Sequence, residues 1–208
     1  MNPSKKLGLV PILVATALAF AGVNSAAAAD RLCETNSSPC SSPVFPAGVI
    51  TAEAFSPLLT GEIEIECVSS TIAIKVAKND GTVNPTGEVS GLSWTACEDI
   101  THGVGCMVTT QGLPYHVEVV TPGPNLTVKP GPFGTSPGVK VVCGAFISCV
   151  FQRSDVTLLF APGSPARVEA FAVSLEKSAG GVLCPKKVFW DADYFAESPT
   201  SSLFVSSS

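Results

Sequence analysis

The stretch GEIEIEC, residues 61–67, decides the fold class of this chain. Glu62, Glu64 and Glu66 alternate with Ile63, Ile65 and Cys67. Because successive side chains of a β-strand point to opposite faces, this alternation predicts a strand at Gly61–Cys67 with one acidic and one apolar face. Cys67 belongs to the apolar face, so we expect its side chain to point into the core.

Similar short runs occur along most of the chain, separated by turn-forming residues. Ser69 and Ser70 predict a turn, and residues 78–81 predict a hairpin turn, since Asn, Asp and Gly tolerate positive φ. Further strands are predicted at Gly48–Phe55, Thr71–Ala77, Glu88–Trp94, Pro114–Thr121, Gly138–Cys143, Cys149–Arg153, Val156–Phe160, Arg167–Leu175, Val182–Trp190 and Ser202–Val205.

Two segments carry weaker patterns. Val168, Phe171, Ala172 and Leu175 also fit a period of 3.6 residues, so one short helix remains an alternative for residues 167–177. Residues 122–137 are rich in proline and glycine and predict a long surface loop. The sequence therefore predicts an all-β fold, an antiparallel β-sandwich or barrel stapled by disulfides, with at most one short helix.

The first residues indicate export. Two lysines precede an uncharged apolar run, and small residues follow before Asp30, which is the layout of a signal peptide over residues 1–29. The alternatives are retention of the run as an anchor, for which it is short, and lipidation of Cys33, whose preceding residues match a lipidation signal poorly. We expect residues 30–46 to form a Ser/Pro/Cys-rich arm and residues 47–208 to form one β domain.

The charge balance restricts the partners. Without residues 1–29 the chain keeps 10 Lys and Arg against 17 Asp and Glu, a net charge of −7. An acidic surface repels phosphate backbones, so we expect no nucleic-acid partner. No later apolar stretch is long enough to cross a bilayer, so we expect no membrane insertion once the signal peptide is removed.

All eight cysteines lie beyond the signal peptide: Cys33, Cys40, Cys67, Cys97, Cys106, Cys143, Cys149 and Cys184. An even number in an exported chain predicts disulfides. Their spacings differ from those of zinc sites, and the chain holds only 2 histidines to support one. Many pairings are possible; we predict local bridges at Cys33–Cys40, Cys97–Cys106 and Cys143–Cys149, and a long one at Cys67–Cys184.

Several short motifs carry a resemblance: Cys67 followed by Val68-Ser69-Ser70, Trp94 before Cys97, Gly105-Cys106, the Cys143 and Cys149 pair leading into Val150-Phe151, and Cys184-Pro185. With these motifs the chain resembles small exported β proteins of high-GC Gram-positive bacteria that are known only as hypothetical or secreted proteins, over most of residues 47–195. The resemblance implies a stapled β-sandwich or barrel without established catalytic residues. Cys33 and Cys40 stand outside the six cysteines shared with that group.

One motif has the form of a catalytic one. Residues 134–138 satisfy G-x-S-x-G, in which Ser136 would be the nucleophile of an α/β-hydrolase. The residue after the serine must supply a backbone N–H to the oxyanion hole, and here it is Pro137, which has none. A strand-like segment follows where a helix is needed, so we do not expect Ser136 to be catalytic.

Other polar residues have a simpler structural interpretation. His116 and Glu118 share one face of a predicted strand and could form an acid/base pair, but we favour a solvated polar face, because such alternation is ordinary in half-exposed strands. His102 is expected to be exposed in a loop. The three glutamates of residues 61–67 do not converge as calcium requires, and they favour a solvated face or a site for a basic partner.

Asp191, Asp193 and Glu197 alternate with aromatic residues near the end of the chain. Such residues make up sugar-binding and glycosidase sites, although a strand with acidic residues outside and aromatic residues inside explains the same pattern. Phosphate loops, metalloprotease helices and redox C-x-x-C pairs do not occur in the sequence, so we expect no cofactor.

These observations favour an exported non-enzymatic protein that acts by surface recognition or as a structural component of the cell exterior. We predict no catalytic, cofactor-binding or metal-ligating residue. The alternatives are a secreted polysaccharide hydrolase with Asp191, Asp193 and Glu197 as its carboxylates, and a carrier that holds a small apolar ligand inside a barrel.

Export generates a first prediction. When the full chain is produced in a secreting bacterial host, we expect the released protein to begin at or near Asp30, because small residues precede it. Amino-terminal sequencing and intact mass measure the cleavage site. Released protein that still carries residues 1–29 would contradict the prediction.

Overall fold

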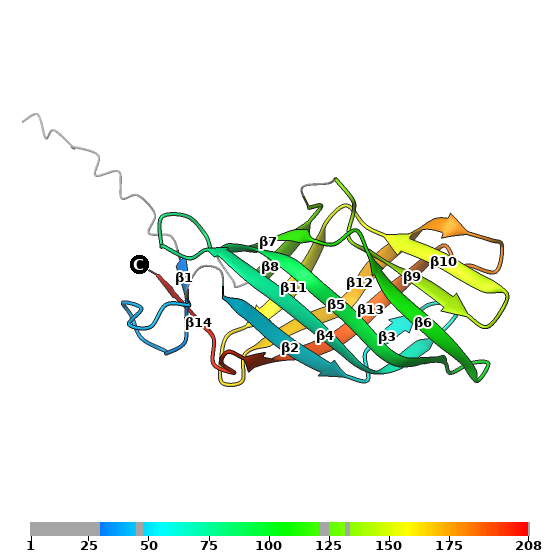
Figure 1. Cartoon of the computed structure of the whole chain (residues 1–208), viewed down its shortest axis with the longest axis horizontal. Helices are drawn as coiled ribbons and strands as arrows, with labels where there is room; N and C mark the ends of the chain where they lie inside the picture. Colours follow the sequence, from blue (N-terminus) through cyan, green and yellow to red (C-terminus); the bar gives the residue numbers. More distant parts are fainter. Residues whose placement is uncertain (1–29, 45–47, 121–124, 132–133, 208) are drawn as a thin grey trace, which may run out of the picture.

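Four long antiparallel strands form the frame of the molecule (Figure 1). They are β4 (Ile65–Lys78), β5 (Thr86–Asp99), β12 (Arg167–Gly180) and β13 (Lys187–Ser198). The computed structural model describes residues 30–44, 48–120, 125–131 and 134–207; the predicted signal peptide lies outside these ranges. Among the described residues every regular element is a strand, which confirms the all-β prediction.

The shorter strands bind to one half or the other of this frame. The amino-terminal half of β5 pairs with β7 (Tyr115–Val120), and its carboxyl-terminal end pairs with β6 (Val104–Gln111). In the same way, β12 pairs first with β11 (Val156–Ala161) and then with β10 (Ile147–Gln152). The frame therefore divides at two forks, one beside β5 and one beside β12.

The remaining strands complete the closure. They are β2 (Val49–Phe55), β3 (Leu58–Thr60), β8 (Asn125–Lys129) and β9 (Gly138–Cys143). Both β2 and β3 pair with β4 on one side and with β13 on the other. One ring of paired strands runs β5-β7-β8-β11-β12-β13-β2-β4, and the other runs β5-β6-β9-β10-β12-β13-β3-β4. The two rings share the four long strands and stack end to end.

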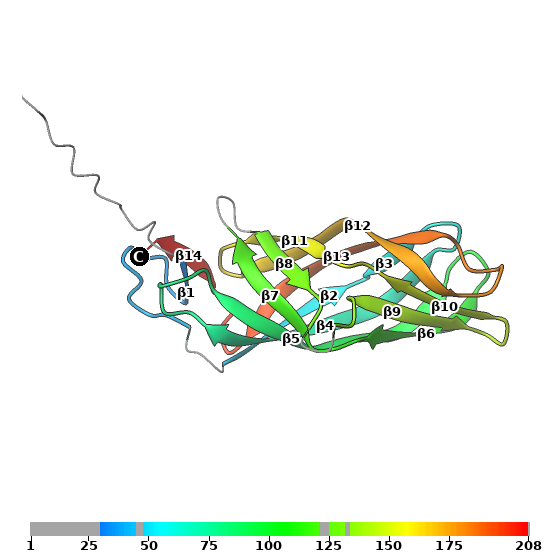
Figure 2. The same cartoon turned by 90° about the horizontal axis from the view of Figure 1, so that it is seen from above.

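We call the end with the first ring the arm end, because β1 (Asp30–Cys33) and β14 (Phe204–Ser207) form a small separate sheet there (Figure 1). The opposite end, at the right of Figure 1, is called the tip end. Figure 2 shows the molecule from above, with β5 and β6 on the opposite side of the interior from β11 and β12. Apolar side chains of both sides fill the space between them.

The predicted strand Gly61–Cys67 is only partly correct. Residues 61–64 form the turn between β3 and β4, and β4 begins at Ile65. The predicted inward face is nevertheless right, since Ile63, Ile65 and Cys67 are all buried. The hairpin turn at residues 78–81 is confirmed at its start, because β4 ends at Lys78, although β5 begins only at Thr86.

The turn predicted at Ser69 and Ser70 is wrong, because β4 continues through both residues. The Ser70 side chain is fully buried, where its hydroxyl donates to the Ser93 carbonyl at 2.8 Å and contacts the Tyr194 hydroxyl at 2.8 Å. These partners satisfy the hydroxyl inside the sheet, so a residue typical of turns is stable within a strand.

The helix alternative at residues 167–177 is also wrong. A β-bulge between Ala170 and Val173 places Ala172 at a φ of 48°. Even-numbered residues face inward before the bulge and odd-numbered residues face inward after it, because the bulge adds one residue to the strand. The combined spacing of the inward residues imitates a helical period. In the predicted loop 122–137, β8 was overlooked: its Leu126 and Val128 alternate inward, but prolines on both sides obscured that short pattern.

The disulfides are Cys33–Cys40, Cys67–Cys97, Cys106–Cys143 and Cys149–Cys184. Only the first agrees with the predicted pairing; Cys97–Cys106, Cys143–Cys149 and Cys67–Cys184 are corrected. Strand register gives the reason, since Cys97 lies directly opposite both Cys67 and Cys106, and Cys106 lies directly opposite Cys143. We call these four residues the cysteine row.

A bridge between Cys97 and Cys106 would leave Cys67 and Cys143 at the two ends of the row. Neighbouring strands lie about 4.8 Å apart, so these ends are separated by roughly 14 Å, far beyond the reach of a disulfide. Only the observed pairing uses all four sulfurs. Cys149 is then joined to Cys184, whose Sγ lies 3.3 Å from the Ser148 carbonyl oxygen in β10.

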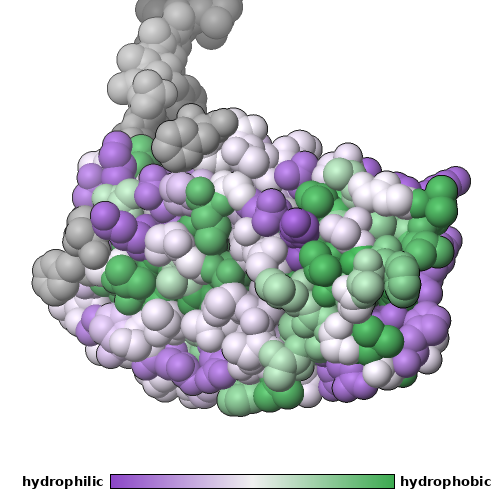
Figure 3. Space-filling model, turned by 45° about the vertical axis from the view of Figure 1, so that its right-hand side comes forward, coloured by the Kyte–Doolittle hydropathy of each residue, from purple (hydrophilic) through white to green (hydrophobic). Residues whose placement is uncertain are grey.

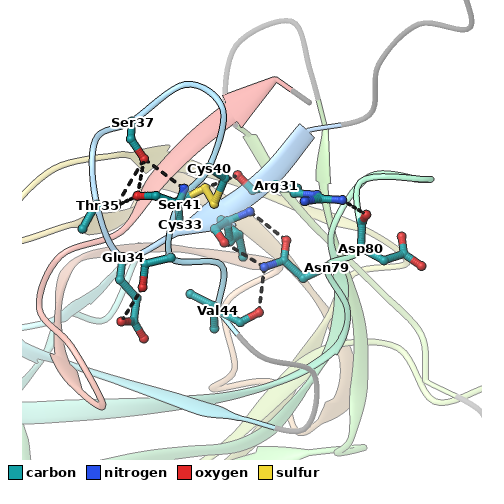
Figure 4. The surroundings of a disulfide bond; sticks show 12 residues. Arg31, Cys33, Glu34, Thr35, Ser37, Cys40, Ser41, Val44, Asn79 and Asp80 are labelled. Atoms are coloured by element: carbon teal, nitrogen blue, oxygen red, sulfur yellow. Dashed lines mark hydrogen bonds between the residues drawn. A yellow bond between two sulfur atoms is a disulfide. The ribbon is translucent and has the colours of Figure 1, made fainter.

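At the arm end, the buried side-chain amide of Asn79 fastens the arm to the rings (Figure 4). The side chain of Asn79 accepts from the Leu32 backbone N–H at 2.8 Å and donates to the carbonyls of Leu32 and Val44 at 2.7 and 2.8 Å. The guanidinium of Arg31 donates to the Asp80 carbonyl beside it. The Cys33–Cys40 bridge closes the loop of the arm, so this bridge shapes the arm rather than the rings.

The lengths of the loops that the disulfides close predict unequal contributions of the disulfides to the free energy of unfolding. Replacing Cys106 and Cys143 together by Ala removes a bridge across 37 residues, and the free energy of unfolding should fall by about 4 kcal/mol in the chain-entropy model. The matched change of Cys33 and Cys40, which spans 7 residues, should cost about 2 kcal/mol. Urea denaturation measures both; an equal or reversed order would contradict the prediction.

Candidate functional site

The tip end carries three neighbouring turns, each at the end of a hairpin. They join β5 to β6 at residues 100–103, β9 to β10 at residues 144–146, and β12 to β13 at residues 181–186. Six large apolar side chains on these turns and on the adjoining start of β6 are exposed: Ile100, Val104, Met107, Phe146, Val182 and Leu183. We call this set the apolar tip.

The exposure of these residues is unusually high. Val182 is 98% exposed and Phe146 is 87% exposed, so their side chains contact almost nothing in the protein. Figure 3 brings the tip end forward and shows apolar surface in several patches on that side, with polar surface between them. Exposed apolar groups gathered at one place are typical of sites that meet a protein, ligand or membrane.

Three disulfides hold the hairpins of the tip end in place. Cys67–Cys97 joins the β3–β4 hairpin to the β5–β6 hairpin, and Cys106–Cys143 joins the latter to the β9–β10 hairpin. Cys149–Cys184 joins that hairpin to the β12–β13 turn. The first bridge thus joins the tip-end halves of β4 and β5, whose connecting turn lies at the arm end, and the other two join hairpins that are not consecutive in the chain, so the apolar side chains are displayed on a covalently braced base.

Asp99 organises the first of the three turns. Its buried carboxylate accepts from the Thr101 backbone N–H at 3.0 Å and contacts His102 Nδ1 at 2.8 Å. The Asp99 carbonyl accepts from the N–H groups of His102 and Gly103. His102 is 59% exposed, as expected, but it is also the outer partner of this carboxylate. The pair stabilises a turn, and no nucleophile accompanies it among the described contacts.

Charges of both signs surround the apolar tip. Lys186 ends the β12–β13 turn and Lys187 begins β13, and Lys177 Nζ donates to the Cys184 carbonyl in the turn at 3.3 Å. Lys187 also lies over the Phe189 ring, 4.8 Å from its centroid. Glu98 and Glu66 lie directly opposite each other on β5 and β4 nearby. The rim is therefore mixed in charge rather than strongly acidic or basic.

The carboxylates of the hydrolase hypothesis do not converge. Asp191, Asp193 and Glu197 lie on the outer face of β13, whereas Trp190 and Tyr194 are buried on the inner face. Asp191 Oδ1 accepts from the Ala172 N–H at 2.7 Å and supports the bulge in β12. An Asp193 carboxylate oxygen lies 3.8 Å from the Arg167 guanidinium.

His116 and Glu118 lie on the polar face of β7, with Tyr115, Val117 and Val119 buried on the other. A Glu118 carboxylate oxygen is 3.8 Å from Nζ of Lys129 on β8, which lies directly opposite His116.

The remaining predicted residues also have structural positions. Glu62 and Glu64 lie in the β3–β4 turn and Glu66 lies in β4, so the three do not share one strand face. Ser136 precedes β9, so a strand follows the G-x-S-x-G motif, and its geometry is not that of a nucleophile elbow.

Two apolar cavities lie among the described residues of the interior. One, of about 50 Å³, lies within the first ring, and Leu32 and Leu203 line it at the arm end. The smaller, about 30 Å³, lies where the two rings meet, and Trp94 and Trp190 line it. The side chain of Ile72 lies in the wall of both cavities.

Sequence reasoning missed the apolar tip. A usable signal exists, because Phe146 follows Gly144-Ala145 and Val182 follows Gly180-Gly181. An apolar residue within a glycine-rich turn has no core to face, which predicts exposure. The cavity between the tryptophans had no such signal, because it depends on where the strands fork.

The fold and the tip define this chain as a disulfide-braced, all-β protein with a closed antiparallel sheet. Comparison with protein-family models, with curated proteins and with solved structures found no match. Among the described residues no helix is long and apolar enough to cross a membrane.

The role of Asp99 in shaping the tip can be tested. Asp99→Ala removes a buried acceptor and leaves the Thr101 N–H without it, so the free energy of unfolding should fall by about 1–3 kcal/mol. Amide hydrogen exchange should accelerate in residues 100–103. His102→Ala, which removes only the exposed partner, serves as the control and should change both quantities much less; equal effects would contradict this role.

Proposed function

We propose that this protein is exported and acts by non-enzymatic recognition, docking its apolar tip onto a lipid surface outside the cytosol. The observation that supports the proposal most directly is the almost complete exposure of Val182 and Phe146 on turns braced by three disulfides. Four disulfides are typical of extracellular proteins, which supports export.

A lipid surface fits this tip better than a folded protein partner. The apolar side chains stand on separate turns with polar surface between them, so a protein would need a matching pocket for each side chain. The interfacial region of a lipid layer is fluid and accommodates separate protrusions without shape complementarity. Each side chain transferred from water contributes about 1.5–3 kcal/mol, so a few of them produce measurable binding.

The charges around the tip indicate which kind of lipid surface the protein binds. Lysines and glutamates both occur on its rim, and the chain after residue 29 is acidic overall. Attraction to anionic headgroups therefore contributes little, and apolar transfer is the main source of affinity. Binding should be almost independent of salt and should not require anionic lipid.

Vesicle flotation tests the proposal with the whole exported chain. The protein should float with phosphatidylcholine vesicles, and Phe146→Ser combined with Val182→Ser should weaken the partition by at least about a hundredfold, because two exposed apolar groups are lost. The matched control combines Phe55→Ser and Phe171→Ser, which are 69% and 77% exposed but lie outside the tip. This control should float like the unchanged protein.

Three results would overturn the proposal. One is equal loss of flotation in the tip and control variants. Another is absence of vesicle binding by the unchanged protein. The third is sedimentation that shows tip-dependent dimers and no lipid binding, which would assign the tip to self-association.

A further inference from the structure

The cysteine row places two disulfides of the tip end next to each other. Its order across the sheet is Cys67 on β4, Cys97 on β5, Cys106 on β6 and Cys143 on β9. The two bridges join the first pair and the last pair of the row. In the middle, Cys97 and Cys106 are direct partners in strand register, although each is bonded to its other neighbour. Each of these two sulfurs therefore has a second cysteine beside it.

The spacing between Cys97 and Cys106 suits a disulfide. Directly opposed side chains leave the sheet on the same face, and their Cβ atoms lie about 4.5–5.5 Å apart. A disulfide needs Cβ atoms about 3.5–4.5 Å apart, so a small approach of β5 and β6 is enough. In the oxidised protein this bridge would leave Cys67 and Cys143 without partners. Once one bridge of the row is reduced, two cysteines of the row must be thiols in any case, and the middle pairing becomes possible.

Cys106 is the most exposed cysteine of the row. The inward face of β6 becomes more exposed toward the tip end, from Val108 at 5% through a half-buried Cys106 to Val104 at 36%. The other three cysteines of the row are at most 7% exposed. Because thiol–disulfide exchange requires access to the attacked sulfur, a thiol from outside meets the row at Cys106.

We propose that Cys106 exchanges disulfides with an external dithiol, and that the disulfide which remains in the row then moves to join Cys97 to Cys106. The cysteine row is thus a redox-sensitive brace of the tip end. This proposal concerns the sulfurs alone and does not rest on lipid docking, so its failure would leave the proposed function standing.

Three exchanges transfer two electrons from the dithiol to the row. A thiolate of the dithiol attacks Cys106 Sγ, the bond to Cys143 breaks, and the Cys143 sulfur leaves with the electron pair and takes up a proton. The second thiolate of the dithiol attacks its own partner sulfur in the mixed disulfide, so the dithiol becomes a disulfide and Cys106 leaves as a thiolate. This thiolate attacks Cys97 Sγ and displaces Cys67, which takes up the second proton. The protein has gained two electrons and two protons, and the dithiol has lost them.

The row also gives the sulfurs the order that the last exchange requires. A thiolate displaces a sulfur from the side opposite the bond that breaks. Cys106, Cys97 and Cys67 follow one another across three neighbouring strands, so the attacking, central and departing sulfurs stand in this order. The product has one local bridge within the β5–β6 hairpin. The bridges from β5 to β4 and from β6 to β9 are then both absent, so the tip end loses two of its three braces.

Limited reduction of the folded, oxidised chain tests the movement of the bridge. An equimolar amount of dithiothreitol is added without denaturant, thiols are blocked at low pH, and peptides are mapped after cleavage at Glu98, which separates Cys97 from Cys106. We expect blocked Cys67 and Cys143 together with a bridge between the Cys97 and Cys106 peptides, which the untreated protein lacks. Reduction of the arm bridge adds blocked thiols of its own and leaves this readout unchanged.

Glutathione tests the entry sulfur, because it has one thiol and its reaction stops at the mixed disulfide. Within the row, brief treatment should place glutathione on Cys106 and leave a thiol on Cys143. Glutathione found mainly on another cysteine of the row would contradict entry at Cys106.

A single variant shows the movement of the bridge without any reductant. Cys143→Ser leaves the Cys106 thiol beside the Cys67–Cys97 bridge, so a blocking reagent should mark Cys67 as well as Cys106.

Cys184→Ser is the matched control, because it frees a cysteine outside the row. The freed Cys149 lies opposite Val141 on β9 and Gly180 on β12, so no bridge of the row is its direct partner. The reagent should mark Cys149 alone.

If limited reduction releases thiols only as the original pairs, with no peptide that links Cys97 to Cys106, the bridge does not move and the proposal is wrong. The same conclusion follows if only Cys106 is marked in the Cys143→Ser variant. The reduction experiment uses the unchanged protein, so it does not depend on whether the variants fold.

Discussion

The register that places four cysteines in one row across β4, β5, β6 and β9 is the constraint on which the tip end depends. Directly opposed residues of neighbouring strands present their side chains on the same side of the sheet, so each sulfur of the row has its neighbours within reach. Two bridges use the row completely. The strands cannot slip by one residue without turning the sulfurs to opposite faces.

The closure of the sheet into two rings determines where the tip turns and the interior cavities lie. Four shared strands carry both rings, and the forks that result leave unpaired stretches such as residues 90–96 on one edge of β5. One fork holds the cavity between Trp94 and Trp190. At the tip end the braced hairpins project turns whose apolar residues have no core to enter. The arm, fastened by Asn79, covers the other end.

Sequence reasoning succeeded for features that depend on neighbouring residues and failed for features that depend on residues far apart in the chain. Strands such as Gly138–Cys143 were predicted with correct bounds, because alternation and flanking turns are properties of a few neighbouring residues. Ser70 was misjudged because its partners, Ser93 and Tyr194, lie far away in the chain. At residues 167–175 the strand was predicted, but the bulge at Ala172 left a helix open as an alternative, because the carboxylate that supports the bulge, Asp191, comes from the next strand.

The amino-acid sequence by itself determined the strand content, the inward and outward faces and the presence of disulfides, because these follow from side-chain alternation and the even number of cysteines. Only the tertiary structure decided which cysteines join, which strands fork, and which polar and apolar groups meet at the tip and in the cavity. The physical reason is that sulfur pairing and cavity shape depend on distances between residues far apart in the chain, and strand register sets those distances only when the rings close.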